Sequence, residues 1–411
     1  MKVTGIITEY NPFHQGHQYH LEKSREITSA DYVIAVMSGD FVQRGTPALL
    51  SKQKRTEMAL RSGADLVLEL PVSYASGSAE FFAEGAIALL DSLHVVTDLC
   101  FGSESGSLED FQSIARILSR EPASYQKTLQ EALRSGVSFP AARSAALCDY
   151  LHTHPEIYSL SSQSPEEFLS TPNNILGLEY CKALFRRDSS IQPHIISRQG
   201  QGYHSAALEE YASATGVRRE LLKEKPDWII LSVVLPRESY RILQEEYQVS
   251  YPVTEDDFSL LLRYRLMLET EESLCRFLDV TPDLARRIKN RENEFITFSA
   301  FANLLKTKEV TYTRICRTLL HILLNLKERP PISCARVLGM RAQAGPLLEA
   351  IQKNSSIPLV QKPVQADSLL DSGGITGFRQ DLFASNLYES VACQKFSREF
   401  THEFQKPLVI V

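Results

Sequence analysis

Residues 3–20 read VTGIITEYNPFHQGHQYH, an apolar, β-branched run followed by a short turn and the start of a polar, helix-like segment. Pro12 ends the strand because it cannot donate a ladder hydrogen bond, and Gly16 lets a ligand approach the backbone. The unpaired N–H groups and the dipole of a helix N-terminus attract anions. His14 and His17 lie three residues apart across this turn, so both can donate to one anion. Two histidines in a surface loop are the plainer interpretation of the tetrapeptide taken alone.

The first hundred residues alternate apolar runs with helical patterns. Strands are predicted at 3–8, 31–37, 64–70 and 95–101, separated by helices at 17–29, 52–61 and 79–90. Near-continuous Val/Ile/Leu strands between helices are typical of a parallel sheet covered on both faces. We therefore predict an α/β fold, with an N-terminal doubly wound parallel-sheet domain followed by a mainly helical C-terminal region.

The carboxyl ends of parallel strands meet at one edge of the sheet, where ligands of such folds bind. Three segments follow the predicted strands, at 11–17, 38–40 and 102–104. We expect them to line one crevice.

The remaining sequence suggests three parts. Residues 107–150 are helical in pattern, with an interruption at Pro140, and look like an insertion. A helix at 174–187 and a strand at 192–198 resume the α/β pattern, and Ser213 is a candidate N-cap of the next helix. We predict an α/β domain at 1–225 with a helical insertion at about 107–165, a helical domain at 226–330 and a mixed C-terminal region at 331–411.

Composition limits the classes of protein that are possible. The 411 residues are enough for two or three domains, and they include neither a run long enough to span a membrane nor a signal-peptide layout. We therefore expect a cytoplasmic protein without a membrane partner. The seven cysteines are scattered and lack a Cys-x-x-Cys pair, which favours buried, reduced thiols over disulfides or a zinc site.

Charge is distributed unevenly along the chain. The net charge is −6, yet residues 286–327 hold nine Lys or Arg and three Glu. A charged helix face is usually just solvated. Here the charges are clustered, His321 lies near Arg314 and Arg317 on one helical face, and Tyr312 offers a possible stacking surface. Together these features favour contact with RNA. The predicted RNA-binding residues are Arg286, Arg287, Lys289, Arg291, Lys306, Lys308, Arg314 and Arg317.

Several blocks of the sequence resemble a known family. The strand, turn and helix of residues 5–20 resemble the HxGH nucleotidyltransferase superfamily, and SATGVR at 213–218 resembles its second motif. More narrowly, the chain is similar to the bacterial tRNA(Met) cytidine acetate ligase family in colinear blocks over nearly its whole length. These blocks are GIITEYNPFHQGHQYHL, VMSGDFVQRGTPAL, ADLVLELPVSYASGSAEFFAEGAI, TPNNILGLEY and TYTRICRTLLHILL.

The resemblance implies an activity and its substrates. The enzyme would activate acetate with ATP, accompanied by Mg²⁺, as acetyl-adenylate, and would transfer the acetyl group to N4 of the wobble cytidine of elongator tRNA(Met). No obligatory protein partner is expected. Two alternatives stay open at this point. A small-metabolite adenylyltransferase of the same superfamily would explain residues 1–220 and leave the basic region without a task, and a non-catalytic RNA-binding protein would carry a vestigial nucleotide site.

The resemblance also assigns site residues. The catalytic candidates are His14, His17, Asp40 and Arg198. Asp40 could orient acetate or a magnesium ion, or could simply form a turn, and Arg44 in the next loop could bind phosphate or remain exposed. ATP contacts are expected from Ile7, Thr8, Glu9, Tyr10, Asn11, Pro12, Phe13, His14, Gln15, Gly16, His17, Gln18, Tyr19, His20, Gly102, Asn173, Asn174, Arg198, Gln199, Ser213 and Thr215, and no metal ligand is assigned.

Overall fold

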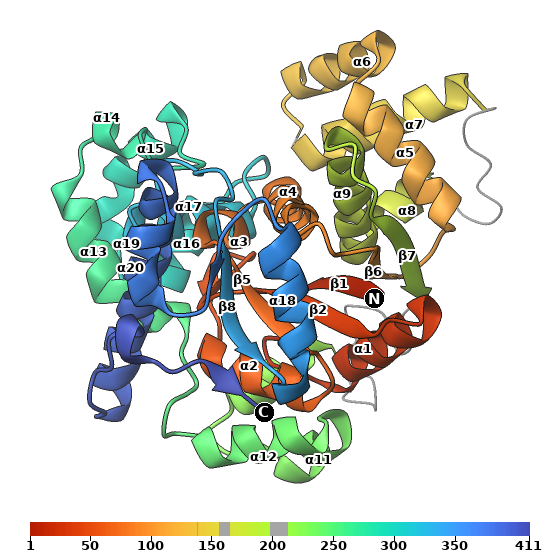
Figure 1. Cartoon of the computed structure of the whole chain (residues 1–411). Coiled ribbons are helices and arrows are strands. Elements are labelled where there is room, and N and C mark those ends of the chain that lie inside the picture. Colours follow the sequence, from red (N-terminus) through yellow and green to blue (C-terminus); the bar gives the residue numbers. More distant parts are fainter. Residues whose placement is uncertain (138, 156–164, 198–212) are drawn as a thin grey trace.

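A central sheet organises the protein, whose computed structural model describes residues 1–137, 139–155, 165–197 and 213–411 (Figure 1). The strand order is β10-β8-β5-β2-β1-β6-β7, with β9 beside β8. Five of these strands are mutually parallel, as predicted: β1 (Val3–Thr8), β2 (Tyr32–Ser38), β5 (Leu66–Leu70), β6 (Asp98–Ser103) and β7 (Gln192–Ser197).

The order of the strands locates the ligand-binding edge. From β1 the chain builds outward through β2 and β5, and then returns to the other side of β1 with β6 and β7. The crevice at such a reversal point, beyond the carboxyl ends of the strands, is where ligands bind in open α/β sheets. The predicted segments after β1 and β6 flank this point.

Helices cover both faces of the sheet, which is why its strands are apolar on both sides. In β2, Ile34 and Val36 pack into one core with α4, whereas Val33, Ala35 and Met37 pack into the other core with α1 and α2. The covering helices are α1 (Gln15–Thr28), α2 (Lys52–Arg61), α4 (Ala79–Ser92), α9 (Pro172–Arg186) and α18 (Gly345–Asn354) (Figure 1). The short helix α3 (Val72–Ala75) precedes α4.

The predicted insertion is helical. It consists of α5 (Leu108–Arg120), α6 (Ala123–Arg134), α7 (Phe139–Thr153) and α8 (Pro165–Ser170). Pro140 does not interrupt a helix, because it lies in the first turn of α7, where a missing N–H costs nothing. Phe111 joins the insertion to the rest of the domain, because its ring lies 5.3 Å from Phe101 of β6 and a Cβ atom on Gly177 of α9 would stand 2.7 Å from it. Within the insertion, the same ring lies 4.9 Å from Phe168 of α8.

A second helical region follows, as predicted, and has a core of its own. Part of the N-terminal domain reaches into that core, because Phe41 of the hairpin β3 (Phe41–Val42) and β4 (Thr46–Pro47) belongs to it. Gly45, at φ +76°, lies so close to α17 that a Cβ atom would stand 2.2 Å from the nitrogen of Arg317. The helices of this core are α13 (Ser259–Leu268), α14 (Glu271–Leu274), α15 (Pro282–Arg291), α16 (Phe298–Leu305) and α17 (Tyr312–Leu323). The preceding helices α10 (Ala214–Leu221), α11 (Trp228–Val234) and α12 (Arg237–Glu246) pack instead into the core of the sheet that also holds α1 and α2.

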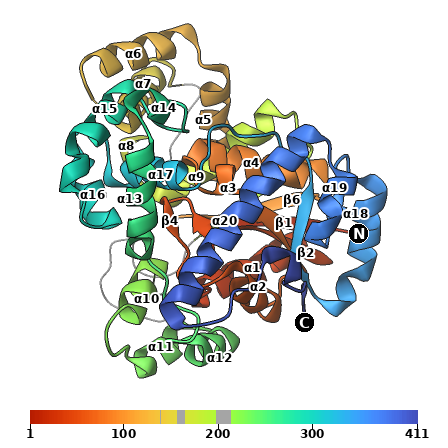
Figure 2. The same ribbon diagram turned by 90° about the vertical axis from the view of Figure 1, so that its left-hand side faces the viewer.

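The C-terminal region adds strands to the sheet, which the sequence patterns did not predict. β8 (Ala335–Met340) pairs antiparallel with β5, and β9 (Leu359–Val360) and β10 (Val409–Ile410) pair parallel with β8. After the short helix α19 (Ala366–Leu369), the long helix α20 (Ser372–Phe396) crosses the molecule (Figure 2). Among the described residues, every helix is too short or too polar to cross a lipid bilayer.

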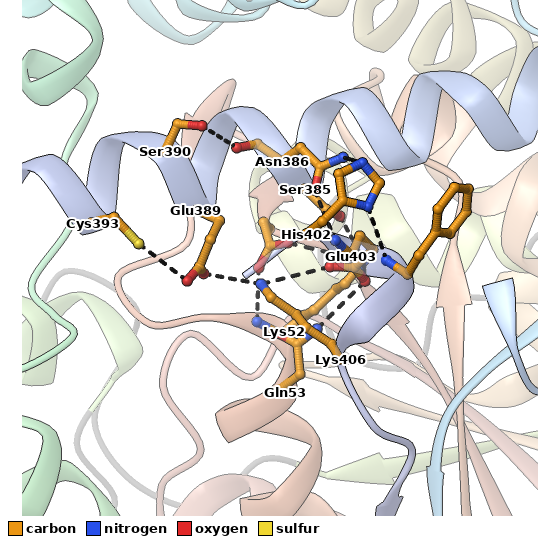
Figure 3. A network of polar contacts seen from close by, with 12 residues as sticks. Lys52, Gln53, Ser385, Asn386, Glu389, Ser390, Cys393, His402, Glu403 and Lys406 are labelled. Carbon is orange, nitrogen blue, oxygen red and sulfur yellow. Dashed lines mark hydrogen bonds and ion pairs between the residues drawn. The ribbon is translucent and has the colours of Figure 1, made fainter. Parts of the chain in front are cut away.

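A buried cluster of charges joins this C-terminal region to the sheet (Figure 3). Lys52, at the start of α2, is 0% exposed, and its Nζ lies 2.7 Å from Glu69 of β5 and 2.8 Å from Glu403. The same nitrogen donates to the hydroxyl of Ser385 in α20 at 2.6 Å. Although burial lowers the pKa of Lys52, the surrounding carboxylates raise it above its ordinary value, so the ammonium stays charged.

We predict that Lys52→Ala lowers the free energy of unfolding by about 3–5 kcal/mol, because it removes one of the two buried cations, Lys52 and Arg336, that compensate the charges of Glu69 and Glu403. Lys54 on the same helix provides a matched control. It pairs with Glu246 at 2.6 Å but is 37% exposed, so Lys54→Ala should cost no more than about 1 kcal/mol. Urea titration of both variants measures the difference, and equal losses would contradict a special role for the buried ammonium.

Candidate functional site

A cavity of about 270 Å³ opens at the carboxyl ends of β1, β6 and β7. The first turns of α1, α9 and α10 also line it, together with the loop between β3 and β4. It therefore lies at the reversal point of the strand order, where the sequence predicted the crevice.

The two histidines cap helix α1 reciprocally. The Nδ1 atom of His14 accepts from the backbone N–H of Gly16 at 3.1 Å, and Nδ1 of His17 accepts from the N–H of His14 at 3.3 Å. The rings stack with centroids 3.8 Å apart. Because both Nδ1 atoms act as acceptors, each neutral ring carries its proton on Nε2. This cap also explains why α1 begins at Gln15, two residues earlier than predicted.

One buried arginine holds the backbone of this turn in place. The guanidinium of Arg55 donates to the carbonyl oxygens of Glu9 at 2.6 Å, Ser38 at 3.1 Å and Leu50 at 3.0 Å, and also to that of Gly39. These carbonyls belong to the segments that leave β1 and β2. Arg55 therefore fixes the two loops relative to each other.

Not all residues of the 7–20 segment reach the cavity. Asn11, Pro12 and Phe13 are buried inward, where the side chain of Asn11 accepts from the N–H of Leu49 at 2.8 Å. Gln15 and Gln18 lie on other faces of α1 and are not among the described lining residues. The predicted residues that do line the cavity are Ile7, Thr8, Glu9, Tyr10, His14, Gly16, His17, Tyr19, His20, Gly102, Asn173, Ser213 and Thr215.

The two neighbouring asparagines have different places. Asn173 lines the cavity, whereas Asn174 is 0% exposed and organises the loop after β6. The side-chain oxygen of Asn174 accepts from the hydroxyl of Ser103 at 3.0 Å, and its nitrogen donates to that of Ser105 at 2.9 Å. Arg198 and Gln199 lie outside the described residues, so the structure says nothing of their roles.

Asp40 is not brought to the cavity, which corrects its expected place beside the histidines. It is 3% exposed, and one carboxylate oxygen accepts from the backbone N–H of Lys52 at 2.8 Å. Burial raises the pKa of Asp40, and the nearby Lys52 ammonium opposes that rise. Because a carboxylate placed this way stabilises the start of α2, we assign Asp40 a structural task.

Sequence reasoning left several lining residues out. Arg218 belongs to the second motif but was not assigned; it lines the cavity and donates to the carbonyl of Asn11 at 2.7 Å. Arg44, considered only as a loop residue, lines the cavity near Arg218. An apolar wall comes from residues whose sequence context shows only core packing, namely Phe82, Phe101, Leu176, Tyr180 and Ile196.

The cavity is suited to an anion. Its lining carries imidazole and guanidinium donors and the N-terminus of α1, and Glu9 is the one carboxylate among the described lining residues. Burial lowers the pKa of Arg218, and the neighbouring charge of Glu9 counteracts this effect. The described residues offer no group of three His, Cys, Asp or Glu side chains that could hold a metal ion.

The predicted RNA-binding residues fall into three groups. Arg287 and Lys289 are engaged inside the helical region, where they donate to the carbonyls of Leu305 at 3.0 Å and Leu266 at 3.1 Å. Others remain at the surface: Arg286 and Arg291 form exposed ion pairs, and Lys306 and Lys308 are exposed. Arg314 and Arg317 lie part-buried on α17, beside the hairpin that carries Arg44.

His321 does not belong to this cationic surface, contrary to the helical periodicity. Its ring is 0% exposed, and Nε2 lies 3.1 Å from the carbonyl oxygen of Ser76 while Nδ1 lies 3.2 Å from that of Leu278. Burial lowers the pKa of His321 to about 4, so the ring is neutral near pH 7. The reason is that residues 73–76 pack on the side of α17 that the sequence alone leaves open.

Comparisons with known proteins agree with this geometry. The model of the HIGH Nucleotidyl Transferase family matches residues 1–403. The tRNA(Met) cytidine acetate ligase of Clostridium novyi is 39% identical over 372 residues, covering 88% of this chain and 90% of the relative. That of Halothermothrix orenii is 38% identical over 431 residues, covering 100% and 99%. A crystal structure of Thermotoga maritima TmcAL bound with alpha-thio ATP superposes over 100% of both chains with a TM-score of 0.91 at 33% identity.

Proposed function

The chain belongs to the tRNA(Met) cytidine acetate ligase family of HIGH nucleotidyl transferases, and from this we propose how its cavity carries out the reaction. It activates acetate with ATP as acetyl-adenylate and transfers the acetyl group to N4 of the wobble cytidine of elongator tRNA(Met). The observation that carries the proposal is the pair of capped histidines at the mouth of α1, inside a cavity at the reversal point of the sheet. Its tRNA substrate places the reaction in the cytoplasm.

ATP activation needs stabilisation of charge more than a covalent nucleophile. A carboxylate oxygen of acetate attacks the α-phosphorus of ATP, and pyrophosphate leaves with the electrons of the broken P–O bond. Negative charge grows on the phosphoryl oxygens, where donors positioned beforehand are most effective. In our proposal the Nε2–H groups of His14 and His17, the N-terminus of α1 and Arg218 supply these donors. Mg²⁺ bound together with ATP would neutralise part of the phosphate charge, and the apolar wall suits the adenine ring.

The second half-reaction explains why ATP is consumed. The amine of cytidine is a weak nucleophile because its lone pair is delocalised into the ring, so it needs an activated acyl donor such as the mixed anhydride. An enzyme acting only on small metabolites would not require the basic helices, and the relatives match this chain through that region as well. We propose that the exposed Lys306 and Lys308, with Arg314 and Arg317, contact the tRNA backbone, and that Arg198 acts on the phosphates.

The proposed function is tested with ATP, labelled acetate and total tRNA, followed by digestion of the RNA and detection of N4-acetylcytidine. We expect acetylated cytidine only when ATP and acetate are present, and none when acetyl-CoA replaces them. Pyrophosphate should be released in an acetate-dependent manner without tRNA. Absence of this release at saturating acetate would exclude the adenylate, and absence of acetylcytidine would exclude the acceptor.

His14→Asn separates capping from catalysis. Asparagine is a strong N-cap, so the variant should keep the stability of α1, whereas His14→Ala should lose about 1 kcal/mol of stability. Both variants lose the Nε2 donor, and acetate-dependent ATP–pyrophosphate exchange should fall by at least about 10²-fold in each. Calorimetry and exchange assays on the same preparations compare the two effects. An Asn variant with normal exchange would show that His14 is only a cap.

The RNA surface is tested through its dependence on salt. Each lysine that contacts a phosphate contributes roughly 0.7–0.9 to the slope of log affinity against log salt concentration. Lys306→Ala/Lys308→Ala should therefore weaken binding of tRNA(Met) and reduce the slope by about 1.5, as measured by gel shift at several salt concentrations. The exposed Lys353 of α18 is the control, and its Ala variant should keep the wild-type slope. Equal slopes in all three proteins would remove this face from the tRNA site.

A further inference from the structure

Glu9 differs in charge from the other ionisable residues that line the cavity. Its neighbours in the lining are histidines, arginines and a helix N-terminus, all of which favour an anion, and it is the only carboxylate that the described lining contains. A carboxylate there repels the phosphates of ATP. Binding of ATP therefore does not account for Glu9, and a different chemical group is its more natural partner.

The carboxylate is also held in a defined position. Its Oε1 accepts from the backbone N–H of Gln43 at 2.8 Å, and its carbonyl oxygen accepts from the buried Arg55 at 2.6 Å. Both contacts tie Glu9 to elements that are themselves fixed, because Gln43 lies in the β3–β4 hairpin and Arg55 in α2. The position of the Glu9 carboxylate is therefore set before a substrate binds.

The position of Glu9 points to the acceptor side of the cavity. The hairpin that binds its carboxylate continues through Arg44 to Gly45, which lies against the backbone of Cys316 and Arg317 in α17. That helix belongs to the surface that we propose for tRNA. A nucleotide delivered from that surface would reach the end of the cavity that Glu9 occupies.

We propose that Glu9 is the catalytic residue that accepts the proton of the cytidine amine during acetyl transfer. This inference rests on the proposed function. N4 attacks the carbonyl carbon of acetyl-adenylate, a C–N bond forms, and the C–O bond to the phosphate breaks. AMP leaves with that electron pair, and one proton of N4 passes to the Glu9 carboxylate. The amine loses its proton readily only as the bond forms, so a base already in place accelerates this step.

Glu9→Gln tests the proposal because the glutamine oxygen can still accept from Gln43 while the base is lost. Acetyl-adenylate formation is measured by trapping the acetyl group with hydroxylamine, and acetyl transfer by single-turnover acetylation of tRNA(Met) with preformed acetyl-adenylate. We expect transfer to fall by at least about 10²-fold, and to fall at least about tenfold more than adenylate formation. The exposed Glu22 of α1 is the control, and Glu22→Gln should match wild type in both assays.

Each outcome decides the matter. Equal loss in both assays, including a loss that extra Mg²⁺ restores, would overturn the proposal and assign Glu9 to ATP or its metal ion. Transfer at the wild-type rate would also overturn it. If wild-type protein forms adenylate but never acetylates tRNA, the proposed function fails and the role of Glu9 is overturned with it, whereas wild-type transfer together with unchanged transfer in Glu9→Gln overturns the role of Glu9 alone. A gel shift with Glu9→Gln must show normal tRNA affinity, since weakened binding in proportion to the lost transfer would make Glu9 a tRNA contact only.

Discussion

The geometry of the crevice depends on one buried guanidinium. Arg55 is 0% exposed, and burial lowers its pKa, whereas the charges of Asp40 and Glu9 act in the opposite direction. Its buried charge is tolerated because backbone carbonyls surround it and carboxylates lie nearby. Those carbonyls come from the exits of β1 and β2 and from the loop before α2. A single side chain therefore determines where the histidine turn, the hairpin and the start of α2 lie relative to one another. If it moved, Glu9 and the capped histidines would no longer face the same cavity.

Helix α2 extends this constraint to the far end of the chain. Three residues before Arg55, Lys52 binds carboxylates from β5 and from the C-terminal segment, and Arg336 of β8 bridges the same two carboxylates at 2.8 and 2.5 Å. Although burial raises the pKa of Glu403, the cations around it hold that pKa at about 2. The C-terminal residues thus complete the charge balance behind the crevice.

A structural feature could be predicted from the sequence where it depends on residues that are close together in the chain. The parallel strands, the bounds of α2 and the histidine turn depend on neighbouring residues, and all appear where they were predicted. Asp40 and His321 depend on partners that sequence spacing does not reveal, namely the N–H of Lys52 and the carbonyls of Ser76 and Leu278. β8 and β10 could not be predicted as members of the sheet, because β8 pairs with a strand about 270 residues earlier. The apolar wall was missed for a similar reason, since aromatic residues of α4, β6 and α9 show the same periodicity whether they meet a core or a ligand.

The capped histidines connect folding with chemistry. A histidine used as a cap must present a lone pair at Nδ1 to the backbone, so the proton resides on Nε2. The fold thereby selects the tautomer that an anion needs. A few residues earlier in the chain, the carboxylate of Glu9 provides a hydrogen-bond acceptor instead of a donor. The hairpin and Arg55 hold Glu9 in place. One short stretch of chain therefore offers donors for a phosphate and an acceptor for an amine, and these are the two groups that meet when an acyl-adenylate transfers its acyl group to a nucleobase.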